Sequence, residues 1–232
     1  MTTALGVGKD ENYDRLSRGV SGLSRCEFDE AARLDTFVGE VEGVEDVEIP
    51  DNFARYTCRN NKLALLALEQ DDFSNKVRSL VARHGPERVG VIIGTSTSGI
   101  RQTEQAYNES VDSHQTETLE SGEKPHITAL PDWYHYRETH NAHSVSDFVG
   151  RVLGIKGYSL TISTACSSSA KVFATGARAI SAGLCDAVVV GGVDTLCLTT
   201  LFGFNSLQLV SHDVCRPCDV NRNGISIGEA GG

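Results

Sequence analysis

The sequence has little of what marks fibrous, membrane-spanning or nucleic-acid-binding proteins. Aromatic residues make up 6% of its 232 positions, and it has five Pro, one Trp and one Met. The uncharged stretches at residues 157–170 and 187–193 are too polar or too short to span a bilayer. Lys and Arg are scarce as well, 21 against 31 Asp and Glu, which argues against broad contact with nucleic-acid phosphates or anionic lipid. We therefore expect a soluble protein with no nucleic-acid partner and no membrane partner.

The residues that are present suit a folded globular domain. Hydrophobic residues make up 40% of the chain and charged residues 22%, which is enough apolar material for a sizeable core and too little charge for a disordered chain. We find no internal repeat and no change of composition that would mark a linker. Collagen, coiled coil and low-complexity sequence are excluded.

Seven cysteines form an odd set, and residues 1–9 do not have the pattern of a signal peptide. Disulfides form mainly in oxidising compartments, so this combination favours free thiols in a reducing one. We expect a cytoplasmic location. The seven are Cys26, Cys58, Cys166, Cys185, Cys197, Cys215 and Cys218.

The order of apolar and polar residues predicts alternating helices and strands. Helical periodicity covers residues 55–69 and 72–84, and the run RVGVIIG at residues 88–94 predicts a buried strand that leads into a polar loop and then a helix. Residues 159–163, 167–182 and 187–191 predict a strand, a helix and a strand in the middle of a layered α/β core. Residues 117–131 are rich in turn-forming residues and predict a long surface excursion over a neighbouring subunit or a pocket mouth.

Cys166 lies in the segment TACSSS, between the predicted strand and the predicted helix that follows it. Unpaired backbone N–H groups and the helix dipole at such a position favour thiolate over thiol, and therefore a nucleophile. The helix at residues 167–182 has apolar residues on several sides, so we expect it to be buried and to hold the sulfur rigidly. The alternative, a small buried hydrophobe such as we expect Cys185 and Cys197 to be, remains open on spacing alone.

Several motifs together give the chain a resemblance to a known family. TACSSSA, GLCDAVVVGGVD and RPCDVNRNGISIGEAG, with VGVIIGTSTSGI before them, resemble the active-site half of a β-ketoacyl-[acyl-carrier-protein] synthase, a condensing enzyme of the thiolase fold. The resemblance covers nearly the whole chain and is strongest to elongating ketosynthases of aryl-polyene clusters. It implies a thiolase-like layered α/β/α fold, of which residues 1–232 form the first of two similar halves, truncated at both ends.

The resemblance also implies a reaction. Cys166 would accept an acyl group from an acyl carrier protein, with its own N–H as an oxyanion donor. Malonyl carrier protein would then lose carbon dioxide, and its enolate would attack the acyl-enzyme to give a 3-oxoacyl product. The two histidines and the lysine that assist this step belong to the family's second half, and none of the seven histidines here matches their surroundings. Four residues would support the site structurally: Asp219, Arg222, Gly228 and Glu229.

The partners follow from charge and from the family. Arg55, Arg59 and Lys62 are spaced to lie near one helix face and would attract an acidic acyl carrier protein, although an ordinary solvated face explains them equally well. The family is dimeric, and by the resemblance the strand that follows the nucleophile segment pairs across the two-fold axis. We expect a homodimer, or a heterodimer with another ketosynthase-like subunit.

Two other functions remain open. The chain would be a non-catalytic chain-length or scaffold subunit if it did not accept acyl groups, although such partners usually lose the nucleophile and this chain retains Cys166. It would be an inactive fragment if half a core failed to fold, because a wide apolar face would then be uncovered.

Metal and cofactor sites are not expected. His135, His140 and His143 have no spacing of a standard zinc site, and a polar loop explains them. Cys215 and Cys218 form a CxxC that lies in a turn and not at the start of a helix after a strand, so we do not expect redox chemistry. Neither a dinucleotide nor a phosphate-binding motif is complete, because Glu11 replaces the third glycine of GxGxxG and residues 90–99 contain no Lys.

Overall fold

The computed structural model describes residues 1–29, 33–110 and 129–232. Most of the predicted excursion at residues 117–131 lies outside these ranges. Within the described ranges, no helix combines the length and hydropathy that crossing a membrane requires.

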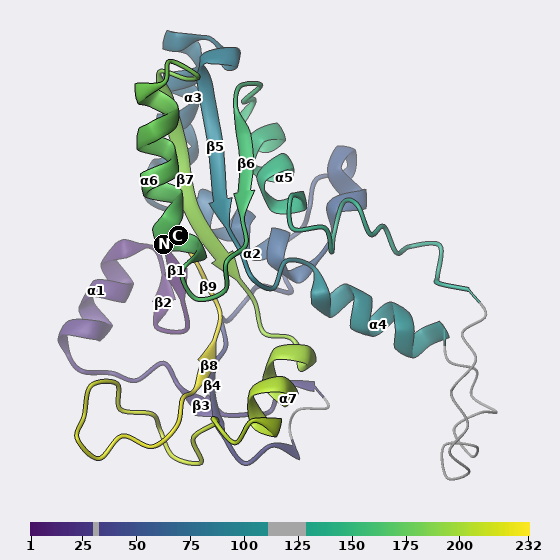
Figure 1. The fold of residues 1–232 in the computed structure, drawn as a ribbon, viewed down its shortest axis with the longest axis vertical. Helices are drawn as coiled ribbons and strands as arrows, with labels where there is room; N and C mark the ends of the chain where they lie inside the picture. Colours follow the sequence, from purple (N-terminus) through teal and green to yellow (C-terminus); the bar gives the residue numbers. More distant parts are fainter. Residues whose placement is uncertain (30–32, 111–128) are drawn as a thin grey trace.

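A six-stranded mixed sheet forms the centre of the molecule, in the order β2-β1-β9-β7-β5-β6 (Figure 1). The run VGVIIG becomes β5, which is buried over its whole length and pairs in parallel with β6 on one side and β7 on the other. The remaining pairs are antiparallel. The strands are β1 (Thr2–Thr3), β2 (Gly6–Val7), β5 (Val89–Gly94), β6 (Ser159–Ile162), β7 (Ala187–Asp194) and β9 (Ala230–Gly231).

Helices cover both faces of this sheet, which gives three layers. On one face α2, α3 and α5 bury the main hydrophobic core, which includes Leu63, Val91 and Phe148. On the opposite face α6 packs against β5, β6 and β7 (Figure 1). The predicted α/β/α layering is confirmed. The helices are α1 (Lys9–Ser17), α2 (Arg59–Leu68), α3 (Phe73–His84), α4 (Ile100–Ser110), α5 (Ser144–Leu153), α6 (Ser168–Ser181) and α7 (Leu198–Ser206).

A smaller sheet lies beside the main one. Its strands, in the order β3-β4-β8, are β3 (Ser24–Arg25), β4 (Phe37–Gly39) and β8 (Ile227–Gly228). A second apolar cluster supports it, in which Val38 of β4 packs with Leu196 and with Leu201 of α7. Because β8 is followed almost at once by β9, this small sheet is joined directly to the central one.

Most of the predicted elements are confirmed. The predicted helix at residues 55–69 divides into a 3₁₀ segment, Asp51–Tyr56, and α2. Helix α3 ends at Gly85, whose φ of 88° is readily available only to a residue without a side chain. The predicted strand, helix and strand around Cys166 correspond to β6, α6 and β7.

Helix α6 corrects one expectation. It is not buried on several faces: the buried residues are Ser168, Val172, Gly176 and Ala179, which lie on one face, toward the sheet. Outside this face, Phe173 is 64% exposed and Ile180 43% exposed. Apolar residues all around a helix predict burial on all sides, but in this chain only the sheet side is packed.

The position of β7 corrects another expectation. The strand after the nucleophile was expected to pair across a dimer axis, but β7 lies inside the sheet, between β5 and β9. The edge strand is β6, which precedes Cys166 and has β5 as its one neighbour in the described sheet. The expectation is wrong because the chain crosses from β6 over β5 before it forms β7.

Candidate functional site

Cys166 lies where the main sheet gives way to α6. Strand β6 ends at Ile162, and α6 begins at Ser168 with Ser167 as its N-cap residue. The thiol residue is exposed. The carboxyl ends of the parallel strands β5, β6 and β7 meet at this edge of the sheet, which is where open α/β sheets usually bind ligands. The predicted position of Cys166 close to a helix start is therefore confirmed.

The turn that carries Cys166 is tightly bonded. Ala165 has a φ of 53°, in the left-handed region that costs a residue with a side chain about 1 kcal/mol or more. The N–H of Ser168 donates to the carbonyl of Ala165 at 3.0 Å, and the N–H of Thr164 donates to Oγ of Ser168 at 2.9 Å. Oγ of Ser168 donates in turn to the carbonyl of Ala165 at 2.6 Å, and Oγ of Ser167 donates to the carbonyl of Thr164 at 2.9 Å. This turn holds Cys166 on a short, strained segment.

Glycines let α6 approach the sheet closely. A Cβ at Gly94 would lie 2.7 Å from the backbone of Ser168 and of Ser169. One at Gly192 would lie 2.0 Å from Oγ of Ser169, and one at Gly176 would lie 2.9 Å from Val188. Real Cβ atoms do not approach other atoms so closely. At Gly94, where the obstruction is backbone, a side chain would push the start of α6 off the sheet, whereas at Gly192 and Gly176 the side chains of Ser169 and Val188 would have to shift.

Asp194, at the end of β7, fixes the loop that follows β5. Its Oδ1 accepts from the N–H groups of Ser96 (2.6 Å) and Thr97 (3.0 Å) and from the hydroxyls of Thr95 and Thr97, both at 3.1 Å. Oγ of Ser96 lies 3.5 Å from Oγ of Ser168. Neither Asp194 nor Ser168 was predicted as a site residue from the sequence. A lone carboxylate at the end of an apolar strand was the available signal for Asp194.

Four other cysteines, Cys26, Cys58, Cys185 and Cys197, are buried and have thiol pKa values that burial raises. Burial raises the pKa of Cys58 to about 12 and also raises the pKa of Cys185 and Cys197. These thiols are therefore protonated at neutral pH. The expectation that Cys185 and Cys197 are small buried hydrophobes is confirmed.

The three basic residues do not form one exposed patch. Arg59 is buried, 4% exposed, and its guanidinium bonds to Glu229 at 2.6 Å and 3.0 Å. It also bonds to Glu45 at 2.7 Å and Glu40 at 3.2 Å. Burial alone would lower the pKa of Arg59, but the carboxylates of Glu229 and Glu45 raise it above its ordinary range. The expectation that Arg59 faces a partner is wrong because it is the centre of an internal ion-pair network.

Glu229 is the second member of this network. Its side chain also accepts from the N–H groups of Val41 (2.9 Å) and Leu196 (3.0 Å), so it joins the small sheet, α2 and the segment after β7. A carboxylate among glycines and alanines, in GEAG, was the sequence signal that it needs a buried partner.

Arg55 and Lys62 lie near each other beside an open depression of about 580 Å³, whose lining also includes Arg101, Trp133 and His135. The side chain of Arg55 is 66% exposed and that of Lys62 is 16% exposed. Lys62 is paired with Glu45 at 3.2 Å and Arg55 with Glu138 at 3.7 Å, so the greater exposure of Arg55 makes it the more available cation of the two.

The other predicted supporting residues lie in local structure. Asp219 accepts from the N–H of Asn221 at 2.7 Å, and Arg222 donates to the carbonyl of Asp219 at 3.0 Å. Gly228 pairs with Gly39 in the small sheet. These contacts organise the loop between α7 and β8, and none of them involves the Cys166 turn.

The described residues hold no group of three or more His, Cys, Asp or Glu side chains placed to bind a metal ion. His140 instead bonds through Nδ1 to the hydroxyl of Thr103 at 2.6 Å, and burial lowers its pKa.

Cys218 lies in a turn closed by the bond from the N–H of Asp219 to the carbonyl of Arg216, at 3.1 Å. Its φ of 66° is left-handed, like that of Ala165.

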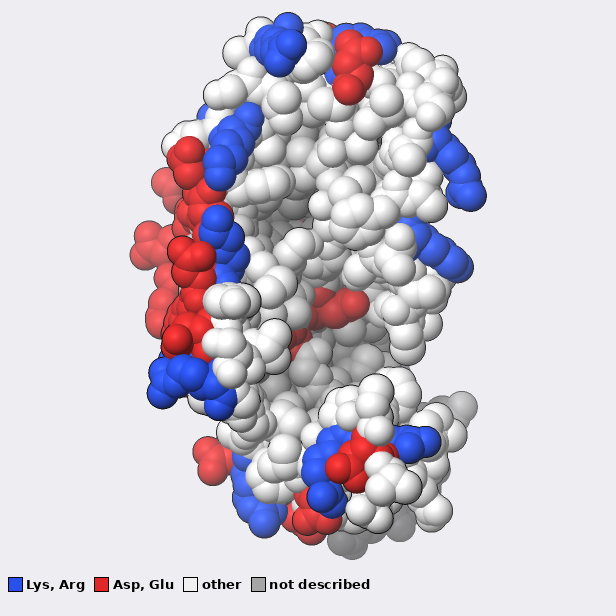
Figure 2. Space-filling model, turned by 90° about the vertical axis from the view of Figure 1, so that its left-hand side faces the viewer, with Lys and Arg blue, Asp and Glu red and all other residues white. Residues whose placement is uncertain are grey.

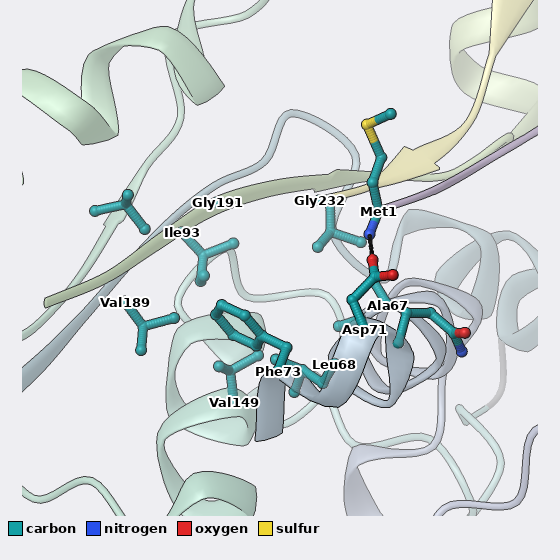
Figure 3. Close-up of a pocket in the computed structure, with 14 residues that line it drawn as sticks. Met1, Ala67, Leu68, Asp71, Phe73, Ile93, Val149, Val189, Gly191 and Gly232 are labelled. Carbon is teal, nitrogen blue, oxygen red and sulfur yellow. Dashed lines mark ion pairs between the residues drawn. The ribbon is translucent and has the colours of Figure 1, made fainter. Parts of the chain in front are cut away.

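An apolar cavity of about 250 Å³ lies on the other face of the sheet, where Ile93, Val149 and Val189 meet Phe73 (Figure 3). The chain termini close one end of it, and the amino group of Met1 lies 3.8 Å from Asp71. From the side that carries the termini, the surface is hollowed at its middle and mostly uncharged there, with charged side chains along its margins (Figure 2). Cys166 is not among the residues that line the cavity.

Comparison with known proteins gives consistent results. A family model described as "Beta-ketoacyl synthase, N-terminal domain" matches residues 1–232. The chloroplastic 3-oxoacyl-[acyl-carrier-protein] synthase I of Hordeum vulgare is 27% identical over 249 aligned residues, which cover 100% of this chain and 50% of that protein. The chain thus spans about half the length of this relative.

Solved structures give the same picture. A chain of the complex between the ketosynthase ApeO and its chain length factor ApeC, from Xenorhabdus doucetiae, is 35% identical with a TM-score of 0.79, over 99% of this chain and 54% of that one. The ishigamide ketosynthase/chain length factor structure matches at 22% identity with a TM-score of 0.75, over 99% of this chain and 54% of that one, and this likeness concerns the fold alone. The expected thiolase-like fold class is confirmed by these matches.

Proposed function

Because the chain belongs to the β-ketoacyl synthase family, we propose that it carries the acyl-accepting site of a 3-oxoacyl-[acyl-carrier-protein] synthase, with Cys166 as the nucleophile. The observation that carries the proposal is the exposed thiol on a strained turn that leads into α6, at the carboxyl ends of three parallel strands. The buried cysteines Cys26, Cys58, Cys185 and Cys197 are unsuited to attack on a substrate because they are protonated and inaccessible.

The proposed step is a thioester exchange. The Cys166 thiol gives up its proton, and the resulting Sγ anion attacks the carbonyl carbon of the acyl thioester on the carrier protein. A new C–S bond forms to Cys166, the C–S bond to the carrier breaks, and the carrier sulfur leaves as a thiolate that takes up a proton. The oxyanion formed on the way would be stabilised by backbone N–H groups of the turn.

By the family resemblance, condensation follows acyl transfer. Decarboxylation of malonyl carrier protein releases carbon dioxide and leaves an enolate, whose carbon attacks the acyl-enzyme carbonyl. This attack forms a C–C bond and breaks the C–S bond to Cys166, which regains its thiol on proton uptake. The two histidines that the family uses here belong to its second half, so we assign residues 1–232 the acyl-transfer step, in fatty-acid, polyene or polyketide assembly.

Two kinds of partner follow. An acidic acyl carrier protein would be attracted by Arg55, which is exposed beside the depression near α2. A second ketosynthase-like subunit is supported by the ApeO–ApeC complex, although the same complex also fits a non-catalytic chain-length role for this chain. We place the protein in the cytoplasm, where its seven cysteine thiols would stay reduced.

Acyl transfer can be tested directly by mass spectrometry. The chain is incubated with an acyl carrier protein loaded with a medium-length acyl group, and the adduct is located by peptide mapping. We expect one acyl group on Cys166, none on the Cys166→Ala variant, and unchanged labelling of Cys166 in Cys218→Ala, which removes the other exposed thiol. A folded chain that takes up no acyl group would favour the chain-length or scaffold role.

A further inference from the structure

We propose that Ser168 is a positioning residue for Cys166, whose hydroxyl holds the turn that presents the thiol. The inference rests on the proposed function, because it concerns the same thiol. Ser168 is the first residue of α6 and is 1% exposed, although the residues before it in the turn are exposed. A buried hydroxyl at an otherwise exposed site needs partners, and here its two shortest hydrogen bonds are to the turn.

The two short bonds of this hydroxyl close a ring around the residue before the nucleophile. Oγ of Ser168 accepts from the N–H of Thr164 at 2.9 Å and donates to the carbonyl of Ala165 at 2.6 Å. Thr164 and Ala165 directly precede Cys166, so the single Oγ atom fixes the peptide groups that set the direction of the chain as it enters Cys166. The backbone N–H of Ser168 adds a further bond to the carbonyl of Ala165, at 3.0 Å.

The ring of hydrogen bonds holds Ala165 in a strained backbone conformation. Ala165 has a φ of 53°, a conformation that alanine leaves readily unless the surroundings enforce it. If the Oγ of Ser168 were absent, Ala165 would be free to relax toward negative φ. Because φ of residue 165 determines where residue 166 lies, this relaxation would swing the Cys166 thiol away from the end of α6.

Ser168 is in turn held in place by contacts with β5 and with the loop that follows it. The absence of a side chain at Gly94 lets the backbone of β5 reach that of Ser168. Oγ of Ser96 lies 3.5 Å from Oγ of Ser168, on the loop that Asp194 holds through four hydrogen bonds. Support therefore runs from the sheet through Ser168 to the turn.

Ser167 makes a useful contrast. It is adjacent in sequence and bonds to the same turn, at the carbonyl of Thr164, but its side chain is exposed. Water can replace an exposed hydroxyl at a carbonyl and cannot readily replace a buried one. We therefore assign the positioning role to Ser168 rather than to Ser167.

The test measures alkylation of Cys166 by iodoacetamide relative to that of Cys218 in the same molecules, by peptide mass mapping between pH 6 and pH 9. We expect Ser168→Ala to lower the ratio of the two rate constants at least about five-fold and to change its pH profile, and Ser167→Ala to lower it less than about two-fold. Ser206→Ala, which removes an exposed bond to the carbonyl of Gly203 in α7, should leave the ratio unchanged.

A rescue variant separates positioning from general destabilisation. Glycine adopts positive φ without steric cost, so Ala165→Gly in the Ser168→Ala background should recover at least about half of the lost rate. An unchanged ratio in Ser168→Ala, an equal loss in Ser167→Ala, or no recovery in the double variant would each overturn the proposal.

Hydrogen exchange in the unmodified chain keeps the proposal testable if Ser168→Ala does not fold. The amide of Thr164 should exchange more slowly than the exposed loop amides around Cys218, and free exchange at Thr164 would reject the ring.

Failure of the proposed function can be distinguished from failure of the positioning role. It would appear as no acyl transfer to Cys166 while the alkylation ratio still depends on Ser168, whereas equal acyl transfer in wild type and Ser168→Ala would reject the positioning role alone.

Discussion

Within the part of the chain that the structure describes, three helices begin beside a cysteine, and one of these cysteines is exposed. Cys58 and Cys197 are the N-cap residues of α2 and α7, and both are buried. Cys166 stands one residue before the N-cap of α6 and is exposed. The local sequence gives all three a similar place relative to a helix dipole, so the dipole cannot be what distinguishes them.

Burial decides between them, and the magnitudes show why. A helix N-terminus stabilises a nearby negative charge by about 0.3–1 kcal/mol, which is less than one pKa unit. Burial raises the thiol pKa of Cys58 from 9.0 to about 12, even though its Sγ accepts the N–H of Asn61. A cysteine at a helix start is therefore a candidate nucleophile only where the surrounding packing leaves it open.

We expect substitution at the buried start of α2 to lower the free energy of unfolding more than substitution at the start of α6. Replacing Glu229 by Gln leaves the buried Arg59 without its main counter-charge, and we expect a loss of about 3–5 kcal/mol in the free energy of unfolding, measured by urea denaturation. Glu45→Gln is the matched control, because it removes a carboxylate from the same guanidinium but at a side chain that is 67% exposed, and it should cost less than about 1 kcal/mol. Equal losses in the two variants would contradict the importance of burial.

The start of α6 can be disturbed through the sheet beneath it. A methyl group at Gly94 would press on the backbone of Ser168, so we expect Gly94→Ala to cost about 2–3 kcal/mol and to slow alkylation of Cys166 but not of Cys218. Gly203→Ala, inside α7 with open space around it, should be neutral or stabilising by up to about 1 kcal/mol. Tolerance of Gly94→Ala with normal Cys166 reactivity would show that the close contact does not matter.

The buried thiol of α2 should also be visible in the pH dependence of stability. The pKa of Cys58 is about 12 in the folded chain and 9.0 ordinarily, so the unfolded chain loses this proton first as pH rises. Its contribution is fully present below pH 9 and is lost toward pH 12, at up to about 1.4 kcal/mol per pH unit. We expect the unfolding free energy of Cys58→Ser to fall less steeply than that of wild type between pH 9 and 11. Parallel curves would contradict this account.

The smallest expected effect concerns Arg55, which is exposed just before α2, and the affinity for an acyl carrier protein. Arg55→Glu should weaken binding of an acidic acyl carrier protein about three- to ten-fold at low salt, with a smaller change at high salt, because exposed charges act mainly through screened attraction. Arg78→Glu is a suitable control, since it makes the same charge change on α3, away from the depression. Equal weakening by both variants would indicate a response to net charge alone.

The sequence predicted those parts of the fold that depend on local patterns. A continuous β-branched run predicted β5, and Gly85 marked the end of α3. Two-residue strands such as β1 and β9 were missed, because their pairing joins Thr2 to Gly231 across the length of the chain and leaves no periodicity. The burial of α6 was overestimated because composition does not tell which side of a helix is covered.

The site was predicted in part for the same reason. Cys166 was predicted as the nucleophile from its motif and its place before a helix, which are local features; the structure confirms the place, and the role stays a prediction. The burial of Arg59 depends on Glu229, 170 residues away, so helical spacing alone placed it wrongly on the surface. The left-handed φ of Ala165 and the bonds of Ser168 depend on how α6 sits on Gly94, and no local pattern encodes that contact.

The glycines of the sheet that contact α6, Gly94 and Gly192, also limit which substitutions this protein can accept during evolution. In an ordinary core, a larger side chain can be accommodated when a neighbouring residue is replaced by a smaller one. Such positions can therefore change in compensating pairs. At Gly94 the obstructing atoms belong to the main chain, which every residue shares, and no second substitution can make them smaller. Selection for reversion should therefore return glycine itself at position 94, whereas at Gly192, where the obstruction is the side chain of Ser169, a second-site change remains available.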